Sequence, residues 1–134
     1  MKYIFLIITV ILSVGCASSA NAHDPEKMAD LASQLKDISA AVDGTLKFSS
    51  ETYTDPQKLL LDALRNDKAK LEVFKDYQLK VVIQEQNAVL LLCEEETLLI
   101  EDAGCTAKSD IQHWQTEEIK ACEASLKTET VCII

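Results

Sequence analysis

Four cysteines downstream of residue 22 have the best-defined chemistry in this sequence. They are Cys93, Cys105, Cys122 and Cys132. In an exported chain, an even number of cysteines predicts two disulfides formed in an oxidising compartment. No two of the four form a Cys-x-x-Cys pair, so the usual motif of thiol oxidoreductases is absent from the sequence.

The histidines His23 and His113 are the candidate metal ligands. If a signal peptidase cut after Ala22, the free amine and the imidazole of His23 could bind Cu(II) together with His113. The alternative is that His23 is a junction residue and His113 a surface residue. Neither histidine lies in a nucleophile motif, and clustered glycines of a phosphate-binding loop are absent. We therefore predict no cofactor, with the copper site as a second alternative.

Two acidic runs, Glu94-Glu95-Glu96 and Glu101-Asp102, supply carboxylates. A glycosidase needs two carboxyl groups about 5 to 9 Å apart beside a cleft, and sequence spacing does not establish such a pair. We interpret the runs as solvated links and predict no catalytic residue. Glu94, Glu95 and Glu96, with Trp114 as an interface anchor, are the candidate partner-binding residues. The alternative for Trp114 is core packing.

The first residues are typical of an export signal. Lys2 gives a positive start, and residues 3–14 form an apolar run too short to span a bilayer as a helix. Ala20-Asn21-Ala22 has small residues at the positions that a signal peptidase inspects, which predicts a signal peptide at residues 1–22.

A competing cleavage site lies nearer the start. Ser13-Val14-Gly15-Cys16 resembles the lipobox of bacterial lipoproteins, although Ser13 stands where that pattern usually has leucine. Lipidation of Cys16 would tether the chain to a membrane. The predicted location is therefore periplasmic or secreted, with an outer-membrane lipoprotein as the alternative.

Charge excludes several partners. The sequence has 13 basic and 22 acidic side chains, and loss of residues 1–22, whose only charge is Lys2, leaves 12 basic and 22 acidic, a formal charge of −10. Binding to nucleic acid or, by charge, to an anionic membrane is therefore not expected. A basic protein would be attracted, although acidity also simply keeps exported proteins soluble.

Two N-terminal helices are predicted, at about residues 25–42 and 56–66. Each begins with Asp-Pro, a helix cap followed by the proline that suits the first turn. In the first helix, apolar residues recur every three or four positions. Asp43-Gly44 is expected to end it, since glycine suits a helix C-terminus.

The second half, about residues 77–132, is predicted to form an antiparallel sheet. Residues 77–83 alternate, and the runs 88–93 and 97–100 suit buried strands. The competing prediction is an all-α disulfide-bonded bundle, because residues 57–103 lack Gly and Pro and their Glu-rich links are poor hairpin turns. Beyond Cys105, Ser109 or Asp110 is expected to cap a short helix.

The last segment, residues 122–132, alternates and predicts a final strand. Ten residues of straight strand span about 33 Å, whereas bonded cysteines need Cα atoms within about 7 Å. In a straight strand, Cys122 and Cys132 would therefore each bond to Cys93 or Cys105. If the segment bends into a hairpin, sequential pairing returns, so the pairing stays open.

These features predict one exported α+β domain at residues 23–134, with two helices packed on a small disulfide-linked antiparallel sheet. The predicted function is a small acidic binding protein of the inhibitor or immunity type, without catalysis. A structural or lipid-anchored envelope protein is the first alternative. A periplasmic copper protein that uses His23 and His113 is the second.

Overall fold

The computed structural model describes residues 23–133. The predicted signal peptide and the candidate lipidation site Cys16 lie outside the described residues. Within residues 23–133, no helix is long and apolar enough to cross a membrane.

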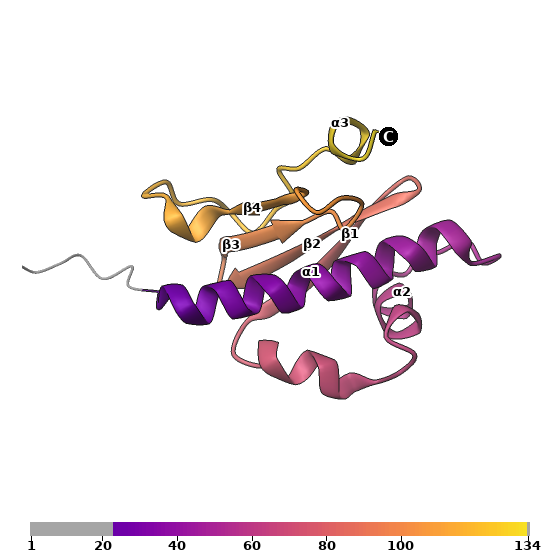
Figure 1. The fold of residues 1–134 in the computed structure, drawn as a ribbon, viewed down its shortest axis with the longest axis horizontal. Coiled ribbons are helices and arrows are strands. Elements are labelled where there is room, and N and C mark those ends of the chain that lie inside the picture. Colours follow the sequence, from indigo (N-terminus) through magenta and orange to yellow (C-terminus); the bar gives the residue numbers. More distant parts are fainter. Residues whose placement is uncertain (1–22, 134) are drawn as a thin grey trace, which may run out of the picture.

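Three α-helices, two 3₁₀ helices and four strands make up this part of the chain (Figure 1). In order they are α1 (Pro25–Phe48), α2 (Pro56–Ala63), η1 (Lys68–Phe74), β1 (Gln78–Gln84), β2 (Asn87–Glu94), β3 (Thr97–Asp102), β4 (Asp110–Gln112), η2 (His113–Gln115) and α3 (Thr128–Val131). The strands form one antiparallel sheet in the order β1-β2-β3-β4. The α+β prediction is confirmed, and the all-α alternative is wrong.

Helix α1 begins as predicted and ends later. The side chain of Asp24 accepts from the backbone N–H of Glu26, and Pro25 follows it. The expected stop at Gly44 is wrong, because the helix continues through this glycine to Phe48 and is closed by the Ser49 N–H, which donates to the Thr45 carbonyl. A single glycine inside a helix costs only about 1 kcal/mol relative to alanine. The other hydrogen bonds of a long helix can offset this cost.

The second helix is shorter than predicted. Asp55 caps α2 through the backbone N–H of Gln57, but the helix ends at Ala63 instead of residue 66. Arg65 and Asn66 follow in the left-handed conformation, with φ of 54° and 60°, which turns the chain away from the helix axis. Residues Lys68–Phe74 then form η1, an element that was not predicted from the sequence.

Two tight hairpins connect β1, β2 and β3. Each has a two-residue loop, Glu85-Gln86 and Glu95-Glu96, whose first glutamate has positive φ. These links lack the Gly or Asn that favours such a conformation, which made them poor turn signals in the sequence. The buried apolar face of each strand outweighs that local cost and sets the hairpin register.

The sheet is apolar on both faces. One face packs against α1 and α2, and the main core contains Leu35, Leu59, Leu90 and Leu92. A register shift after Leu92 in the β2–β3 ladder allows the consecutive residues Leu99 and Ile100 to join this core. Burial of large aliphatic side chains of this kind stabilises the fold by about 1.5 to 3 kcal/mol each.

A segment that we call the C-terminal strap, residues 116–133, covers the other face (Figure 1). Its Leu126 packs with Val89, Leu91 and Leu98 of the sheet. The strand predicted at residues 122–132 is wrong: the strap is mostly irregular and contains only the short helix α3. Its alternation does not make a strand because the strap lies across the sheet face, where its backbone N–H groups donate to the side chains of Glu101 and Gln84.

Two disulfides hold the strap. Cys93 in β2 bonds to Cys122, and Cys105 bonds to Cys132, with Cα atoms 5.9 and 5.5 Å apart. Each disulfide joins one cysteine of the sheet region to one cysteine of the strap. This is the pairing expected for a straight strand at residues 122–132, although the strap does not form that strand. The disulfides indicate folding in an oxidising environment outside the cytoplasm.

The loop between β3 and β4 packs directly on α1. Gly104 has a φ of +72°, and a Cβ atom at this position would overlap the carbonyl group of Ser39. The Ser39 hydroxyl donates to the Asp102 carbonyl at 2.9 Å. The helix predicted to start at Ser109 or Asp110 is wrong, because Asp110 begins β4, which pairs with β3 and leads into η2.

Candidate functional site

The acidic hairpin loop, Glu94-Glu95-Glu96, stands exposed at one end of the sheet. It is held rigidly on both sides. Cys93, just before it, is bonded to Cys122 of the strap. The Cys122 N–H donates to the Glu96 carbonyl, and the Leu98 N–H donates to the Lys120 carbonyl, both at 2.9 Å. The three carboxylates are therefore presented on a fixed backbone.

More acidic groups surround this loop. Glu117, Glu118 and Glu123 of the strap are exposed. Glu95, Glu96 and Glu123 line one side groove together with Lys80. Ile119, 74% exposed, stands in the same stretch of strap. This end of the molecule thus combines a carboxylate-rich surface with a protruding apolar side chain.

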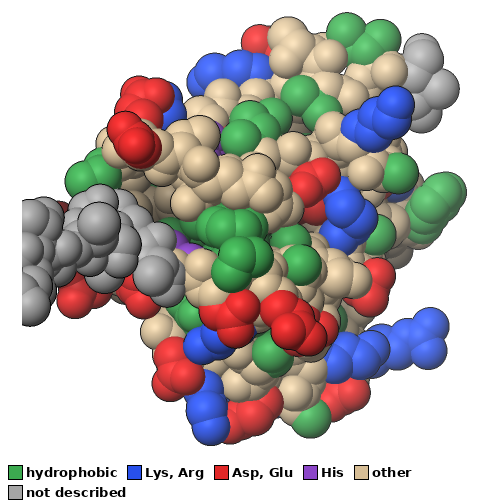
Figure 2. Space-filling model, turned by 60° about the vertical axis from the view of Figure 1, so that its left-hand side comes forward, with side chains coloured by type: hydrophobic (Ala, Val, Ile, Leu, Met, Phe, Trp, Pro, Cys, Tyr) green, Lys and Arg blue, Asp and Glu red, His purple; other side chains and the backbone are tan. Residues whose placement is uncertain are grey.

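A small cavity of about 100 Å³ lies between the start of α1, the acidic hairpin loop and η2. His23, Glu94 and His113 line it, with Trp114 and Ile119. Figure 2 shows this side of the molecule, where a hydrophobic patch lies near the centre and acidic and basic side chains lie above and below it. The cavity brings together both candidate metal ligands and one candidate partner-binding glutamate.

The two histidines differ in environment. His113 is buried, with 7% exposure, so its interpretation as a surface residue is wrong. His23 is partly buried, and its Nε2 lies 3.6 Å from a carboxylate oxygen of Glu94. Trp114 is half-buried, packs against the main core and donates through Nε1 to the Gln112 side chain at 2.7 Å. It is therefore mainly a packing residue that also forms one cavity wall.

Glu101 is the central acceptor behind the cavity. Its side chain is fully buried in β3. It accepts from His113 Nε2 at 2.8 Å, from the Ser125 hydroxyl, and from the backbone N–H groups of Ser125 and Leu126 at 2.9 and 3.1 Å. Four donors from two separate segments thus converge on one carboxylate.

These donors keep Glu101 ionised. Burial alone would raise the pKa of this carboxyl, but the hydrogen bonds from Ser125, His113 and the Leu126 N–H outweigh it, so the pKa lies below its usual value. A general acid would need the opposite shift. The Ser125 hydroxyl bonds to Glu101 and not to His113, so the three side chains do not form a nucleophilic triad.

The neighbouring carboxylate, Asp102, serves another contact. Adjacent strand residues point to opposite faces, so Glu101 faces the strap while Asp102 faces α1. Lys36 of α1 donates to Asp102 at 2.9 Å and to Asp110 at 3.2 Å. Burial alone would lower the pKa of Lys36, but the hydrogen bonds and charges of both aspartates raise it above its usual value. The Glu101-Asp102 run is thus two structural anchors, not an acid/base pair.

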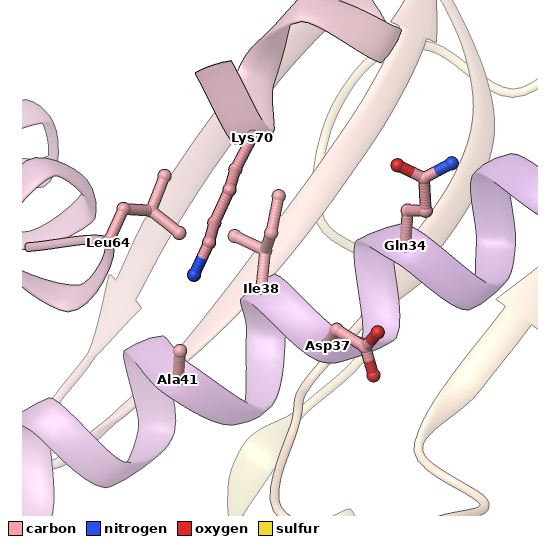
Figure 3. A pocket seen from close by; sticks show the side chains of 6 residues that line it. All are labelled: Gln34, Asp37, Ile38, Ala41, Leu64 and Lys70. Atoms are coloured by element: carbon pink, nitrogen blue, oxygen red, sulfur yellow. The ribbon is translucent and has the colours of Figure 1, made fainter. Parts of the chain in front are cut away.

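A second hollow of about 260 Å³ lies between α1 and η1. Figure 3 shows Lys70 reaching down from η1 between Leu64 and Ile38, while Asp37 and Gln34 point away from its amine. Its polar groups therefore do not converge on one point. This hollow has an apolar floor and one amine, but no arrangement suited to catalysis.

Among residues 23–133, no three side chains of His, Cys, Asp or Glu are grouped so as to hold a metal ion. The four cysteines of this range are used in disulfides. Any metal site built on His23 and His113 therefore needs a ligand that is not one of these side chains.

Sequence reasoning missed three anchoring side chains. Gln84 bonds to the Leu126 carbonyl and to the N–H and hydroxyl of Thr128. Lys36 and Ser125 were missed in the same way, since each partner lies far away in sequence. A charged residue inside an apolar run, such as Glu101 directly after Leu98-Leu99-Ile100, was the available signal of a buried anchor.

Comparisons with protein-family models, with curated proteins and with solved structures give no significant match to this chain.

Proposed function

We propose that this chain is a small exported binding protein, periplasmic or secreted, that occupies a positively charged site on a protein partner. It acts as an inhibitor or immunity-type protein and performs no catalysis itself. The acidic hairpin loop, exposed and fixed by the Cys93–Cys122 disulfide, is the observation that carries this proposal.

Rigidity is what makes this loop suited to inhibition. A flexible acidic segment loses conformational entropy when it binds, whereas a loop fixed beforehand loses little. The disulfide and the backbone hydrogen bonds at Glu96 and Leu98 provide that fixation before any partner arrives. The exposed Ile119 adds an apolar contact beside the carboxylates.

The negative charge of the molecule indicates a partner with a basic surface. Carboxylates at one end of a chain with a formal charge of −10 after signal cleavage attract a basic surface and increase the association rate. Arginine- and lysine-rich clefts are the sites that such a loop can fill. Binding should therefore weaken as salt is raised.

A charge-reversal experiment tests the proposal. Glu94→Lys, Glu95→Lys and Glu96→Lys are combined in one variant, and the partner is captured from envelope extract at low and high salt. We expect the native protein to retain a basic partner at low salt and to release it at high salt. The reversed variant should capture at least tenfold less.

The matched control reverses three exposed acidic residues away from this loop, Glu72, Glu85 and Glu129. It changes net charge equally and should keep the partner. Equal loss in both variants would mean that only overall charge matters, and retention in both would refute a role for the loop. The intact mass of the native protein, isolated from its envelope, tests export through a start at His23.

A further inference from the structure

His113 is a buried imidazole with one ring nitrogen fixed and the other open. Nε2 lies 2.8 Å from the Glu101 carboxylate, which only accepts hydrogen bonds when ionised, so Nε2 carries the hydrogen. In the neutral ring the lone pair is then on Nδ1. Within residues 23–133, Nδ1 makes no hydrogen bond, and His113 lines the small cavity.

This arrangement is typical of metal-binding histidines. Such residues usually donate their second ring N–H to a carboxylate or carbonyl, which fixes the tautomer and makes the ligating nitrogen more basic. Glu101 is itself fixed by Ser125 and Leu126, so the ring orientation is held by the fold.

The facing side of the cavity supplies the remaining donors. His23 lines the same space, and its Nε2 lies 3.6 Å from Glu94. When a residue such as His23 is the first of a chain, its α-amine and Nδ1 can bind one ion together as a chelate. Cleavage after Ala22 would create that amine on a residue that lines the cavity.

We propose that the cavity between the start of α1 and η2 binds one Cu(II) ion through the α-amine and imidazole of His23 and Nδ1 of His113. Glu94 supplies negative charge at the rim. Nitrogen donors favour Cu(II) over the other divalent first-row ions. Because the side chains alone do not provide three ligands, the site is complete only after signal cleavage.

The dependence on cleavage makes the proposal testable without disturbing the fold. Disulfide-bonded protein that starts at His23 is compared with the same protein that retains Ala22 in front of it. Cu(II) is titrated in competition with a chelator of known affinity, and electron paramagnetic resonance reports the nitrogen ligands. We expect one Cu(II) per chain, and at least 100-fold weaker binding when Ala22 is present.

The second variant is His113→Gln, which also should weaken binding about 100-fold and remove one nitrogen from the spectrum. Thermal unfolding without metal checks that both variants are folded. Equal affinity of the three proteins would overturn the proposal, as would binding that depends on the amine but not on His113. The cavity shares Glu94 and Ile119 with the proposed partner surface, but neither is a copper ligand, so chelator-treated protein should still bind that partner.

Discussion

At the scale of single residues, Glu101 has the largest role, because its carboxylate joins β3, η2 and the strap. Replacement by Gln keeps the size but puts an NH₂ group opposite donors that need acceptors. At least one of the His113, Ser125 and Leu126 donors would then be unsatisfied. We expect Glu101→Gln to lower the free energy of unfolding by about 2 to 3 kcal/mol at pH 7, measured by urea denaturation.

The pH dependence of this effect has a defined sign. The pKa of Glu101 is lower in the folded state than in the unfolded chain, where it is about 4.3. Its stabilisation is therefore complete above the unfolded pKa and is lost as the pH falls through the folded value. The difference between wild type and Glu101→Gln should shrink as the pH is lowered below about 4. A constant difference would show that proton binding at Glu101 is not coupled to folding.

At the scale of elements, the two hairpins are held against the preference of their own loop residues. Glu85 has a φ of 56°, a conformation that costs a non-glycine residue about 1 to 2 kcal/mol. We expect Glu85→Gly to stabilise the protein by up to about 1 kcal/mol, since the relief exceeds the added chain entropy of glycine. The melting temperature should rise accordingly.

Gln86 is the matched control, because it follows Glu85 in the same loop without a positive φ. Gln86→Gly should therefore destabilise the protein by about 0.5 to 1 kcal/mol. Opposite signs for the two neighbours would show that the left-handed residue controls this turn. Destabilisation by both substitutions would contradict the prediction that the positive φ of Glu85 costs free energy.

The elements also show what the sequence could predict. The apolar spacing of Met28, Leu31 and Leu35 identified α1, and both Asp-Pro pairs marked helix starts. Local sequence patterns were weak or misleading wherever contacts between residues distant in sequence determine the structure. The three cases are the continuation of α1 through Gly44, the hairpins with glutamate loops, and the strap. In particular, the alternation in residues 122–132 reflects contacts of Leu126 and Thr128 with the sheet, not strand pairing.

The candidate site was predictable only in its parts. Acidic residues 94–96 and the histidines could be selected by type, but their meeting at one cavity depends on the packing of α1 against the sheet. The burial of His113 depends on Glu101, whose anchoring role follows from four donors distant in sequence. No short motif encodes such a cluster.

At the scale of the whole molecule, the two disulfides limit how far the strap can separate from the sheet. They close chain separations of 29 and 27 residues, and each should contribute about 3 to 4 kcal/mol. Paired Cys→Ala replacement removes one link at a time. We expect both double variants to lose about this much stability in urea denaturation.

Amide hydrogen exchange should distinguish the two links. Loss of Cys93–Cys122 should speed exchange at the backbone N–H groups of Leu98 and of position 122, which hold the acidic hairpin loop. Loss of Cys105–Cys132 should instead speed exchange at Thr128, which donates to Gln84. Identical exchange patterns in the two variants would mean that the strap opens as one unit.

The order of the cysteines along the chain has a consequence for resistance to proteolysis. The two links interleave, since Cys105 lies inside the loop closed by Cys93 and Cys122, while Cys132 lies outside it. One peptide bond cut anywhere between Cys93 and Cys132 therefore leaves the two pieces covalently joined. A nicked copy would be one water heavier than the intact protein until it is reduced, and it could keep its acidic loop and strap in place.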